Sequence, residues 1–581
     1  MARNPFVPKL FVCLAEGYGR EGLVRDSLAG LVVGIVALPL ALAFAIGSGV
    51  DPVRGLYTAI VAGFLVSFLG GSRVQIGGPT GAFVVIVYGI VQKYGTQGLV
   101  ACTVIAGVMV LALGLARLGT LIKFIPYPVI TGFTSGIALI ILSGQVKDFL
   151  GLRMGPVPPE FVEKWEAYGK NISTFNPAAL GVGLGTLVVV LLWPRVTKKI
   201  PSPFVAMVLA TLAVAIFQLP VETIGSRFGT VPSGIPVPHD PGIGLKEIRE
   251  LVSPAFTIAL LAAIESLLSA VVADGMIGSR HKSNMELVAQ GLANIASGLF
   301  GGIPATGALA RTATNVKSGG RTPVAGMVHA ITLLLILLFF GRWAAMIPLA
   351  ALAAILVVVA YNMSEWRSFR ALLLAPKGDI AVLVLTFLLT IFVDLTVAVQ
   401  VGVVMSALLF MQRMAEVTDV VGVTDDLRGR SAKEDSKEFL AIHDRVQTLG
   451  RDAVPKGVEV FEVQGPFFFG AADKLKHVLD QLDDVPKVFV LRMRYVPTVD
   501  ATGVNRLRQV ANQLRSQGTE ILIAELPPEP RHTLLRVDRL TYFPRWRFAR
   551  SMPEAFEKAR QVMSGELPPQ GAPAPDKGDE E

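Results

Sequence analysis

Glu265 and Arg311 are ionisable side chains inside long apolar stretches, and Glu265 is the only carboxylate well inside such a run. A charged group in these surroundings is costly, so it usually serves a ligand, an ion or a proton pathway. A carboxyl group removed from water is readily neutralised, so Glu265 could bind and release a proton in a transport cycle. Ser269 follows one turn later on the same helical face. The alternative for Glu265 is a structural acid that stays protonated or pairs with Arg311.

Two similar pieces rich in Gly and Pro precede short apolar segments in the two halves of the chain. Gly77–Ala82 reads GGPTGA, and Gly301–Ala308 reads GGIPATGA about 226 residues later. The following segments, 80–92 and 308–318, reach only about half of a 30 Å membrane core at roughly 1.5 Å per residue. Interrupted segments at corresponding positions predict an inverted-repeat transporter with a midplane binding site. Chance is the alternative, because the chain has 58 Gly and 37 Pro.

The starts of these two short helices could bind an anion together. Free backbone N–H groups and the positive dipole end favour negative charge at a helix N-terminus. Arg311 stands in the first turn of the second short helix, where a cation opposes the dipole and needs an anionic partner or water. A structural salt bridge is the alternative for Arg311.

The first apolar run carries a proline among small residues, in Leu38–Phe44 (LPLALAF). Proline removes a backbone donor from a helix, so it lets another helix approach or leaves a carbonyl free for other use. Phe44, one turn further on, is more often a packing residue than a ligand contact.

The composition divides the chain into a membrane body and a soluble tail. Hydrophobic residues make up 52% and charged residues only 17%, whereas soluble proteins have about 25% charged residues. Residues 1–414 contain 47 of the 98 charged side chains, and residues 415–581 contain the other 51. The formal charge of +8 combines about +11 in the body with about −3 in the tail, which argues against a nucleic-acid binder.

Apolar runs of about 20 residues can cross a bilayer as helices. Twelve such runs and the two short segments predict an α-helical polytopic membrane protein with 14 transmembrane segments in a seven-plus-seven inverted repeat. An even number puts both termini on one side, and basic residues in the short connections place that side in the cytoplasm. The twelve runs are 28–47, 54–70, 98–116, 129–146, 178–193, 203–219, 254–273, 286–300, 324–341, 346–361, 379–394 and 397–412.

The usual motifs of metal, nucleotide and hydrolase chemistry are absent from the sequence. Cys13 and Cys102 are its only cysteines, and its six histidines show no HExxH or paired spacing. No GxxxxGK[ST] or GxSxG motif occurs. We therefore expect no catalytic residue, no metal, no cofactor and no enzymatic activity.

After Met414, short β-rich runs alternate with amphipathic helices, which predicts a small α/β domain. The predicted strands are 458–463, 487–493 and 520–524, and the predicted helices are 471–482, 503–517 and 553–563. The expected organisation is a cytoplasmic N-terminal segment 1–26, a transmembrane domain 27–414, a linker 415–435, a folded domain 436–563 and a disordered tail 564–581.

Several of these residues resemble the signatures of the SulP (sulfate permease) family of anion transporters. They are Leu38–Pro39 with Ala43–Ala45, Gly55–Tyr57, Gly71–Arg73 with Gly78–Thr80, and Asn284–Asn294 followed by Gly301–Gly302. The resemblance covers nearly the whole chain. It implies the fourteen-segment fold, a core domain that moves substrate past a gate domain, and a homodimer. The anion site that it implies consists of Leu40, Phe44, Thr80, Gly81, Ala82, Glu265, Ala308, Leu309, Ala310 and Arg311.

Two departures from the family pattern bear on the substrate. Leu40 stands where many members have Gln, and Glu265 with Ser269 replaces the Asp and Thr of sodium-coupled bicarbonate members. With Ala308–Arg311 (ALAR), Glu265 makes the chain more similar to the proton-coupled branch that carries C4-dicarboxylates such as fumarate and succinate. The leading hypothesis is therefore proton-coupled dicarboxylate symport. The alternatives are a sodium-coupled bicarbonate or sulfate transporter, and an anion channel or exchanger.

The tail resembles a STAS domain, the regulatory module shared with anti-sigma-factor antagonists. Val499–Gly503 (VDATG) matches its loop and helix start, but Ala501 stands where the antagonists carry a phosphorylated Ser, which excludes phosphorylation there. Asp500 as an N-cap and Gly503 as a turn residue are the structural interpretation. The domain is expected to assist dimerisation or to bind a cytoplasmic regulator, and nucleotide binding is an alternative. The resemblance implies a multi-pass protein of the bacterial cytoplasmic (inner) membrane.

Overall fold

The chain, seen here as a computed structural model, divides into two compact units, Met1–Ser406 and Ala407–Glu581. Helix α18 (Leu395–Val417) contains the boundary between them. The described residues are 4–120, 126–197, 200–229, 234, 236–238, 245–393, 395–424, 454–468, 474–475, 485–538 and 542–567.

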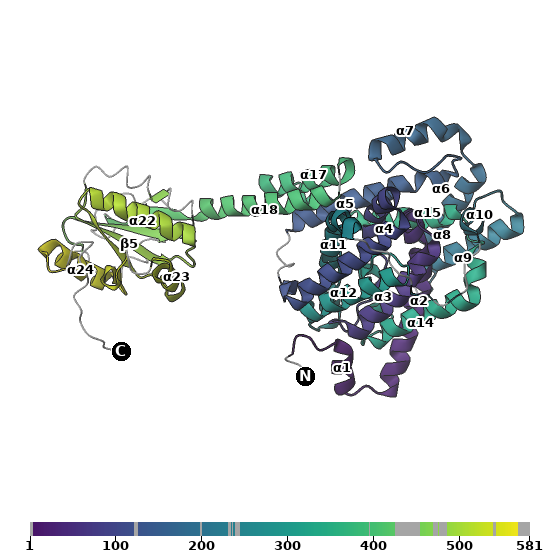
Figure 1. Cartoon of the computed structure of the whole chain (residues 1–581), viewed down its shortest axis with the longest axis horizontal. Coiled ribbons are helices and arrows are strands. Elements are labelled where there is room, and N and C mark those ends of the chain that lie inside the picture. Colours follow the sequence, from purple (N-terminus) through teal and green to yellow (C-terminus); the bar gives the residue numbers. More distant parts are fainter. Residues whose placement is uncertain are drawn as a thin grey trace. The chain divides into compact units, whose positions relative to one another are not determined.

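The first unit is a body of α-helices (Figure 1). Among its described residues and those of α18, nine helical stretches are long and apolar enough to cross a membrane, which confirms a multi-pass membrane body. Every apolar run predicted from the sequence contains a helix. These helices are α2 (Arg20–Gly47), α3 (Pro52–Leu69), α4 (Gly81–Leu115), α5 (Tyr127–Gly144), α8 (Pro177–Val196), α9 (Ser202–Phe217), α11 (Leu245–Ile277), α12 (Ser283–Leu299), α13 (Leu309–Lys317), α14 (Val324–Ala344), α15 (Leu349–Met363), α17 (Lys377–Phe392) and α18.

Shorter helices lie in the connections, where the sequence shows no long apolar run. Polar side chains begin several helices: Asp51 Oδ1 accepts from the Val53 N–H at 2.9 Å, and Pro52 occupies the first position of α3. Asn176 caps α8 in the same way. The short helices are α1 (Lys9–Ala15), α6 (Val146–Leu150), α7 (Phe161–Asn171), η2 (Ile172–Thr174), α10 (Ile224–Phe228) and α16 (Trp366–Leu372).

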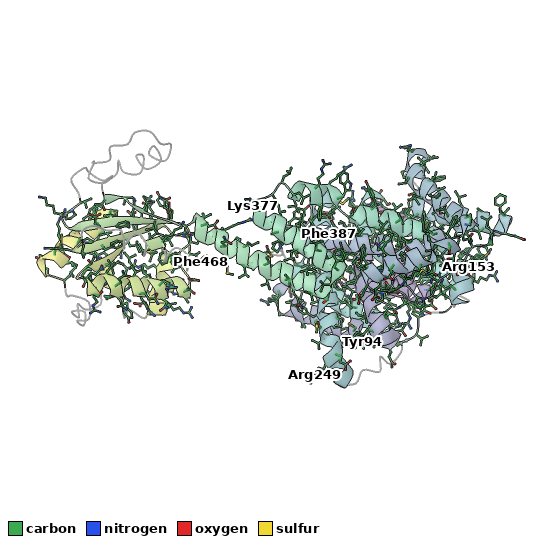
Figure 2. The ribbon with its side chains drawn as sticks, turned by 90° about the horizontal axis from the view of Figure 1, so that it is seen from above. Tyr94, Arg153, Arg249, Lys377, Phe387 and Phe468 are labelled. Carbon is green, nitrogen blue, oxygen red and sulfur yellow. The ribbon has the colours of Figure 1, made fainter. Side chains whose placement is uncertain are left out.

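The long helices pack as two bundles. The first bundle consists of α2, α3, α4, α11, α12, α13 and α14, and the second consists of α5, α8, α9, α15 and α17. On the second bundle, Phe387 of α17, labelled in Figure 2, meets Phe369 of α16 edge to face with ring centroids 5.2 Å apart. The bundles meet where α2 contacts α9 and α15 and where α4 contacts α5.

Two short helices follow the Gly- and Pro-rich pieces, as predicted. The first is the start of α4, which leaves helical geometry at Gly95, where φ is +69°; the second is α13. Just before them, β1 (Gly77–Gly78) pairs antiparallel with β2 (Thr306–Gly307). The two pieces therefore lie next to each other, joined by a two-stranded ladder.

The register of the internal repeat differs from the one read from the letters. The sequence aligns Thr-Gly-Ala with Thr-Gly-Ala, which pairs Gly81 with Gly307. In the structure Gly81 begins α4, whereas Gly307 still belongs to β2 and α13 begins at Leu309. By position in the helix, Gly81 corresponds to Leu309, since each is the first residue of its helix. The glycine that matches Gly81 by letter, Gly307, is a strand residue.

Two further carboxylates, one at the first residue of an apolar run and one just before a run, are also buried. Glu286 of α12 is fully buried, and its Oε2 accepts hydrogen bonds from the backbone N–H groups of Gly71 at 2.8 Å and Ser72 at 3.0 Å. Asp26 of α2 is also fully buried and accepts from the Arg321 N–H at 2.8 Å. Both carboxylates tie a connection to a helix, because buried backbone donors need acceptors.

The second unit is an α/β domain, as predicted. Its sheet has the order β3–β4–β5–β6–β7, in which β3 (Asp419–Gly422) is antiparallel to β4 (Val458–Gln464). β5 (Val488–Tyr495), β6 (Glu520–Ala524) and β7 (Phe548–Ala549) follow in parallel. Alternate strand residues pack on α22 (Ala501–Ser516) and α23 (Pro528–Asp538) on one face and on α24 (Met552–Ser564) on the other.

Asp500 caps α22, as predicted, since its Oδ1 accepts a hydrogen bond from the Gly503 N–H at 2.6 Å. Gly503 is a residue of the first helical turn, not a turn residue, and a Cβ there would lie 2.2 Å from the Phe467 carbonyl oxygen. The glycine therefore allows a close approach between the helix and the chain before it.

Some predictions for the tail fall partly beyond the described residues. β3 lies inside the range expected to be a linker, 415–435, and residues 425–435 are outside the described part. The expected helix 471–482 is described only at 474–475. The expected tail 564–581 is described as far as residue 567.

Candidate functional site

Glu265 and Thr80 meet at the start of the first short helix. The Thr80 hydroxyl donates a hydrogen bond to Glu265 Oε2 at 3.1 Å. Thr80 is the N-cap of α4, and Glu265 lies well inside α11, so the bond joins residues that are far apart in sequence. Both side chains are partly exposed. A group that can hold a proton therefore stands beside the positive end of a helix dipole.

Arg311 lies in the first turn of α13 and is almost fully buried, with 2% of its surface exposed. Its Nη2 donates to the Pro79 carbonyl oxygen, and its Nη1 has no hydrogen-bond partner within the described part of the chain. A Cβ on Gly78 would lie 2.4 Å from Nη1, so this glycine makes room for the guanidinium. Arg311 therefore binds the piece before α4 through a carbonyl, and it makes no ion pair with Glu265.

Ser269 faces the second short helix. Its hydroxyl donates to Thr312 Oγ1 at 3.4 Å, which is a long hydrogen bond. Ser266, which the sequence analysis did not single out, accepts from the Gly307 N–H at 3.1 Å and bonds to Thr306 Oγ1 at 2.7 Å. The hydroxyl groups of α11 therefore hold β2 and α13 in place.

Gly81 marks a close approach between the two bundles. A Cβ there would lie 2.7 Å from Met363 Sδ, at the end of α15, and 3.3 Å from the ring of Phe44. Leu40 and Phe44 of α2 and Ala82 of α4 are buried. Phe44 thus packs against the start of α4, close enough to touch a ligand bound there.

The start of the second short helix is more open. Ala308 is buried, but Leu309 is 44% exposed and Ala310 is exposed as well. Of the expected site residues at this start, Leu309 and Ala310 are therefore accessible, whereas Arg311 is buried.

Pro39 lies inside α2, and another helix approaches there, as predicted. A Cβ on Gly55 of α3 would lie 2.0 Å from the Ala41 carbonyl oxygen. The small residues around the proline therefore allow α3 to pack closely against α2, one turn before Phe44.

A cavity opens beside Glu265 between the two bundles. Its walls come from α5, α11 and α18, and most of its lining side chains are apolar, such as Phe133 and Leu261. Glu265 and Glu365 are the charged residues in its described lining. Glu365 has a φ of +41°, a strained conformation for a residue other than glycine. The cavity thus presents two carboxylates and an apolar surface.

Sequence reasoning missed the polar side chains that anchor the crossing of the two short helices. Asn294 accepts from the Ala305 N–H at 2.8 Å and donates to its carbonyl at 2.9 Å. Thr58 Oγ1 accepts from the Ile303 N–H at 2.7 Å. One signal for them is present in α12, where polar residues recur every fourth position at Glu286, Gln290 and Asn294.

Comparisons with known proteins agree with this architecture. Residues 23–386 match the sulfate permease family, and residues 452–555 match the STAS domain. "Putative sulfate transporter YvdB" of Bacillus subtilis is 40% identical over 89% of this chain and 94% of its own. "Bicarbonate transporter BicA" of Picosynechococcus sp. is 31% identical over 90% of this chain and 91% of its own.

A solved structure has the same fold. The murine Slc26a9 anion transporter in the inward-facing state superposes with a TM-score of 0.81 at 19% identity, covering 96% of this chain and 94% of that chain. The helical body and the sheet-containing second unit fit these matches. The protein therefore belongs to the sulfate permease family, as an anion transporter with a C-terminal STAS domain.

Proposed function

We propose that this anion transporter couples anion uptake to protons through Glu265, and that its substrate is a small oxyanion, sulfate or bicarbonate. The observation that carries the coupling is the 3.1 Å hydrogen bond from the Thr80 hydroxyl to Glu265 Oε2. It joins a proton acceptor to the helix start at which an anion would bind. The names of the Bacillus and Picosynechococcus relatives support the oxyanion.

The charged carboxylate of Glu265 and a bound anion would compete for the Thr80 hydroxyl. Thr80 has a single O–H donor, and a charged Glu265 takes it. A proton on Glu265 weakens that acceptor, so the Thr80 hydroxyl can turn toward an anion at the start of α4. The proton also removes the repulsion between the carboxylate and the anion. Each ligand then favours the other, which is the thermodynamic condition for symport.

The cavity between the bundles supports the same coupling. Its described lining includes Glu265 and Glu365 and no basic residue. An anion would therefore enter it more easily after Glu265 has bound a proton. Alternating access would then move the first bundle, as the core, past the second bundle, as the gate, across the contact of Gly81 with Met363.

Proton-coupled symport of C4-dicarboxylates, the hypothesis taken from the resemblance, is the second candidate. The apolar walls of the cavity favour it, because fumarate and succinate have an apolar middle between two carboxylates. The names of the relatives favour sulfate and bicarbonate instead.

Sodium coupling remains an alternative. The Ser269 hydroxyl, the expected counterpart of the family's sodium-site Thr, donates to Thr312 and keeps its oxygen lone pairs for a cation. An anion channel or exchanger would need no protonatable group beside the site. Dependence of uptake on each gradient separates these alternatives.

The proposal includes the finer architecture expected from the sequence. It comprises fourteen segments in a seven-plus-seven inverted repeat, a homodimer, both termini on the cytoplasmic side of a bacterial inner membrane, and a cytoplasmic regulator of the STAS domain. The antiparallel pairing of β1 with β2 supports the inverted repeat, since it joins the two short helices at their starts.

Uptake into proteoliposomes tests the proposal. Labelled sulfate, bicarbonate and fumarate are offered under an inward proton gradient and, separately, under an inward sodium gradient. We expect proton-driven accumulation of sulfate or bicarbonate. Accumulation of fumarate alone would replace the substrate with a dicarboxylate, and dependence on sodium alone would exclude the coupling mechanism.

The variant Glu265→Gln tests the coupling residue. We expect it to abolish uphill uptake and to retain exchange of labelled for unlabelled substrate, because a neutral amide cannot cycle a proton. Glu250→Gln makes the same change at an exposed position of the same helix and should behave as the wild type. Proton-driven accumulation retained in Glu265→Gln would remove this residue from the coupling role.

A further inference from the structure

The STAS domain contains a second cavity, at the edge of its sheet where the parallel strands end. Arg494 lies at the end of β5, Glu525 follows β6, and Arg550 follows β7. Arg531 reaches the same cavity from α23. Ligands of open α/β sheets bind at the carboxyl ends of the strands, so these side chains stand at the usual place for a ligand.

The charge of this cavity is unbalanced. Its lining contains three arginines and one glutamate, a net charge of +2. Glu525 is already bound, since its Oε2 accepts from Arg492 Nε at 2.6 Å. Among the described residues, no carboxylate forms an ion pair with Arg494, Arg531 or Arg550. None of the three guanidinium groups forms an ion pair among the described residues, although the Glu554 carboxylate accepts from the Arg550 backbone N–H at 2.7 Å.

Arg531 has a buried donor that nothing in the described chain satisfies. Its Nε has no hydrogen-bond partner, and its guanidinium carbon lies 5.4 Å from the centre of the Phe548 ring. Buried polar groups almost always have a partner, because an unsatisfied donor loses its hydration without compensation. The ring holds the guanidinium in place, and an acceptor inside the cavity would complete its bonds.

The turn after β6 shows strain at the same point. Glu525 has a φ of +54°, although it is not a glycine, and its N–H donates to the Ala549 carbonyl at 2.9 Å. Strained residues of this kind concentrate at ligand sites, where the surrounding structure holds them. The strain, the orphan donor and the unbalanced charge therefore coincide in one cavity.

We propose that this cavity binds a phosphate group carrying two negative charges, as inorganic phosphate or as a phosphate monoester. Arginine matches the oxygens of a phosphate with pairs of parallel hydrogen bonds. A phosphate monoester carries close to two negative charges at neutral pH, which balances the lining. The site lies in the STAS domain, so it would serve regulation and not transport.

Isothermal calorimetry on the full-length protein in detergent tests this site. The probes are inorganic phosphate, glycerol 3-phosphate and succinate. We expect both phosphate probes to bind and the variants Arg531→Ala and Arg550→Ala each to weaken binding by about tenfold or more, the effect of losing a charge-assisted hydrogen bond. Arg536→Ala, at an exposed position of α23 outside the cavity, is the matched control and should bind like the wild type.

The comparison of probes and variants separates the outcomes. Tighter binding of glycerol 3-phosphate than of phosphate would assign the site to an ester, such as a metabolite or a lipid headgroup, and equal binding would assign it to free phosphate. Arg550 is exposed, so we expect Arg550→Ala to fold. This variant therefore still tests the site if Arg531→Ala fails to fold. Failure of both phosphate probes to bind at millimolar concentration would overturn the proposal. Equal affinity of the wild type and Arg550→Ala for phosphate would also overturn it. Binding of succinate that is tighter than that of phosphate and depends on Arg550 would do the same.

Discussion

The same letters, Thr-Gly-Ala, stand at the starts of both short helices, but the two starts are built differently. At the first, Thr80 caps α4 and its hydroxyl reaches Glu265 beside the cavity. At the second, Thr306 lies in β2, and its hydroxyl is bonded to Ser266 and to the Ala262 carbonyl. One threonine is thus partly exposed, and the other is buried within the structure.

This difference shows that the internal repeat duplicates a backbone shape and not a set of functional side chains. The first start directs a hydroxyl to the Glu265 carboxylate of α11, whereas the second contributes a guanidinium that binds back to Pro79. A substrate site between them is therefore chemically asymmetric. Substitutions at matched positions, namely the two glycines and the two threonines, should accordingly produce unequal effects.

The largest expected difference concerns the two glycines. A Cβ on Gly307 would lie 1.6 Å from Gln75 Nε2, whose amide is held by the Ser266 carbonyl. Gly307→Ala should therefore prevent folding or lower the melting temperature by about 3–10 °C, since overpacking a tight core costs about 1–3 kcal/mol. Gly81→Ala meets the flexible end of Met363 and should lower stability far less. Thermal unfolding in detergent measures both, and equal losses would contradict the asymmetry.

Arg311 should affect substrates according to their charge. Arg311→Ala should weaken the apparent affinity for sulfate by at least about tenfold, and for a monoanion such as bicarbonate by less, because the lost attraction scales with the charge of the anion. Competition of each anion for labelled uptake measures the ratio. Arg311→Lys keeps the charge, so its affinity for sulfate should lie between those of the wild type and Arg311→Ala. An equal loss of affinity for both anions in Arg311→Ala would make Arg311 a structural residue.

The two threonines should separate stability from transport. Thr306→Val leaves buried partners unsatisfied and should cost about 1–3 kcal/mol of folding free energy. Thr80→Val removes one hydrogen bond from a partly exposed side chain, so it should change stability little and raise the substrate concentration for half-maximal uptake. Unfolding and uptake measured on the same two preparations test the pair. A stability loss in Thr80→Val as large as in Thr306→Val would remove the distinction.

Ser269→Ala should have the smallest effect. Its hydrogen bond to Thr312 is long, at 3.4 Å, so we expect a stability change of no more than about 0.5 kcal/mol and unchanged proton-driven uptake. Loss of a sodium-dependent component in this variant would show that the serine binds the ion after all.

Much of the fold follows from the sequence, because the long helices coincide with apolar runs, and the start of α4 and α13 each follow a Gly- and Pro-rich piece. The register of the repeat does not follow, since identical letters form a helix start at Gly81 and a strand at Gly307. That choice depends on contacts of Gln75 and Ser266 with β2, which link distant segments. A strand of two residues also carries no periodicity that a pattern could reveal.

The candidate site shows the same limit. The types and positions of Glu265 and Thr80 suggested a site, and they meet in the structure, but the roles assigned to them stay predictions. Whether Ser269 and Arg311 turn toward Glu265 could not be read from spacing, because the backbone carbonyl of Pro79 and the hydroxyl of Thr312 attract them elsewhere. Backbone acceptors leave no mark in the pattern of residue types.

The short ladder between β1 and β2 also bears on how the protein is made. Its partners, Gly77 with Gly307 and Gly78 with Thr306, are separated by almost 40% of the chain. At roughly 5–20 residues per second of synthesis, the first strand waits on the order of 10–50 s for its partner. The sequence predicts this ladder near the middle of the membrane, where unsatisfied backbone groups are costly. Until the ribosome has delivered the second strand, we therefore expect water or the insertion machinery to satisfy the backbone groups of the first.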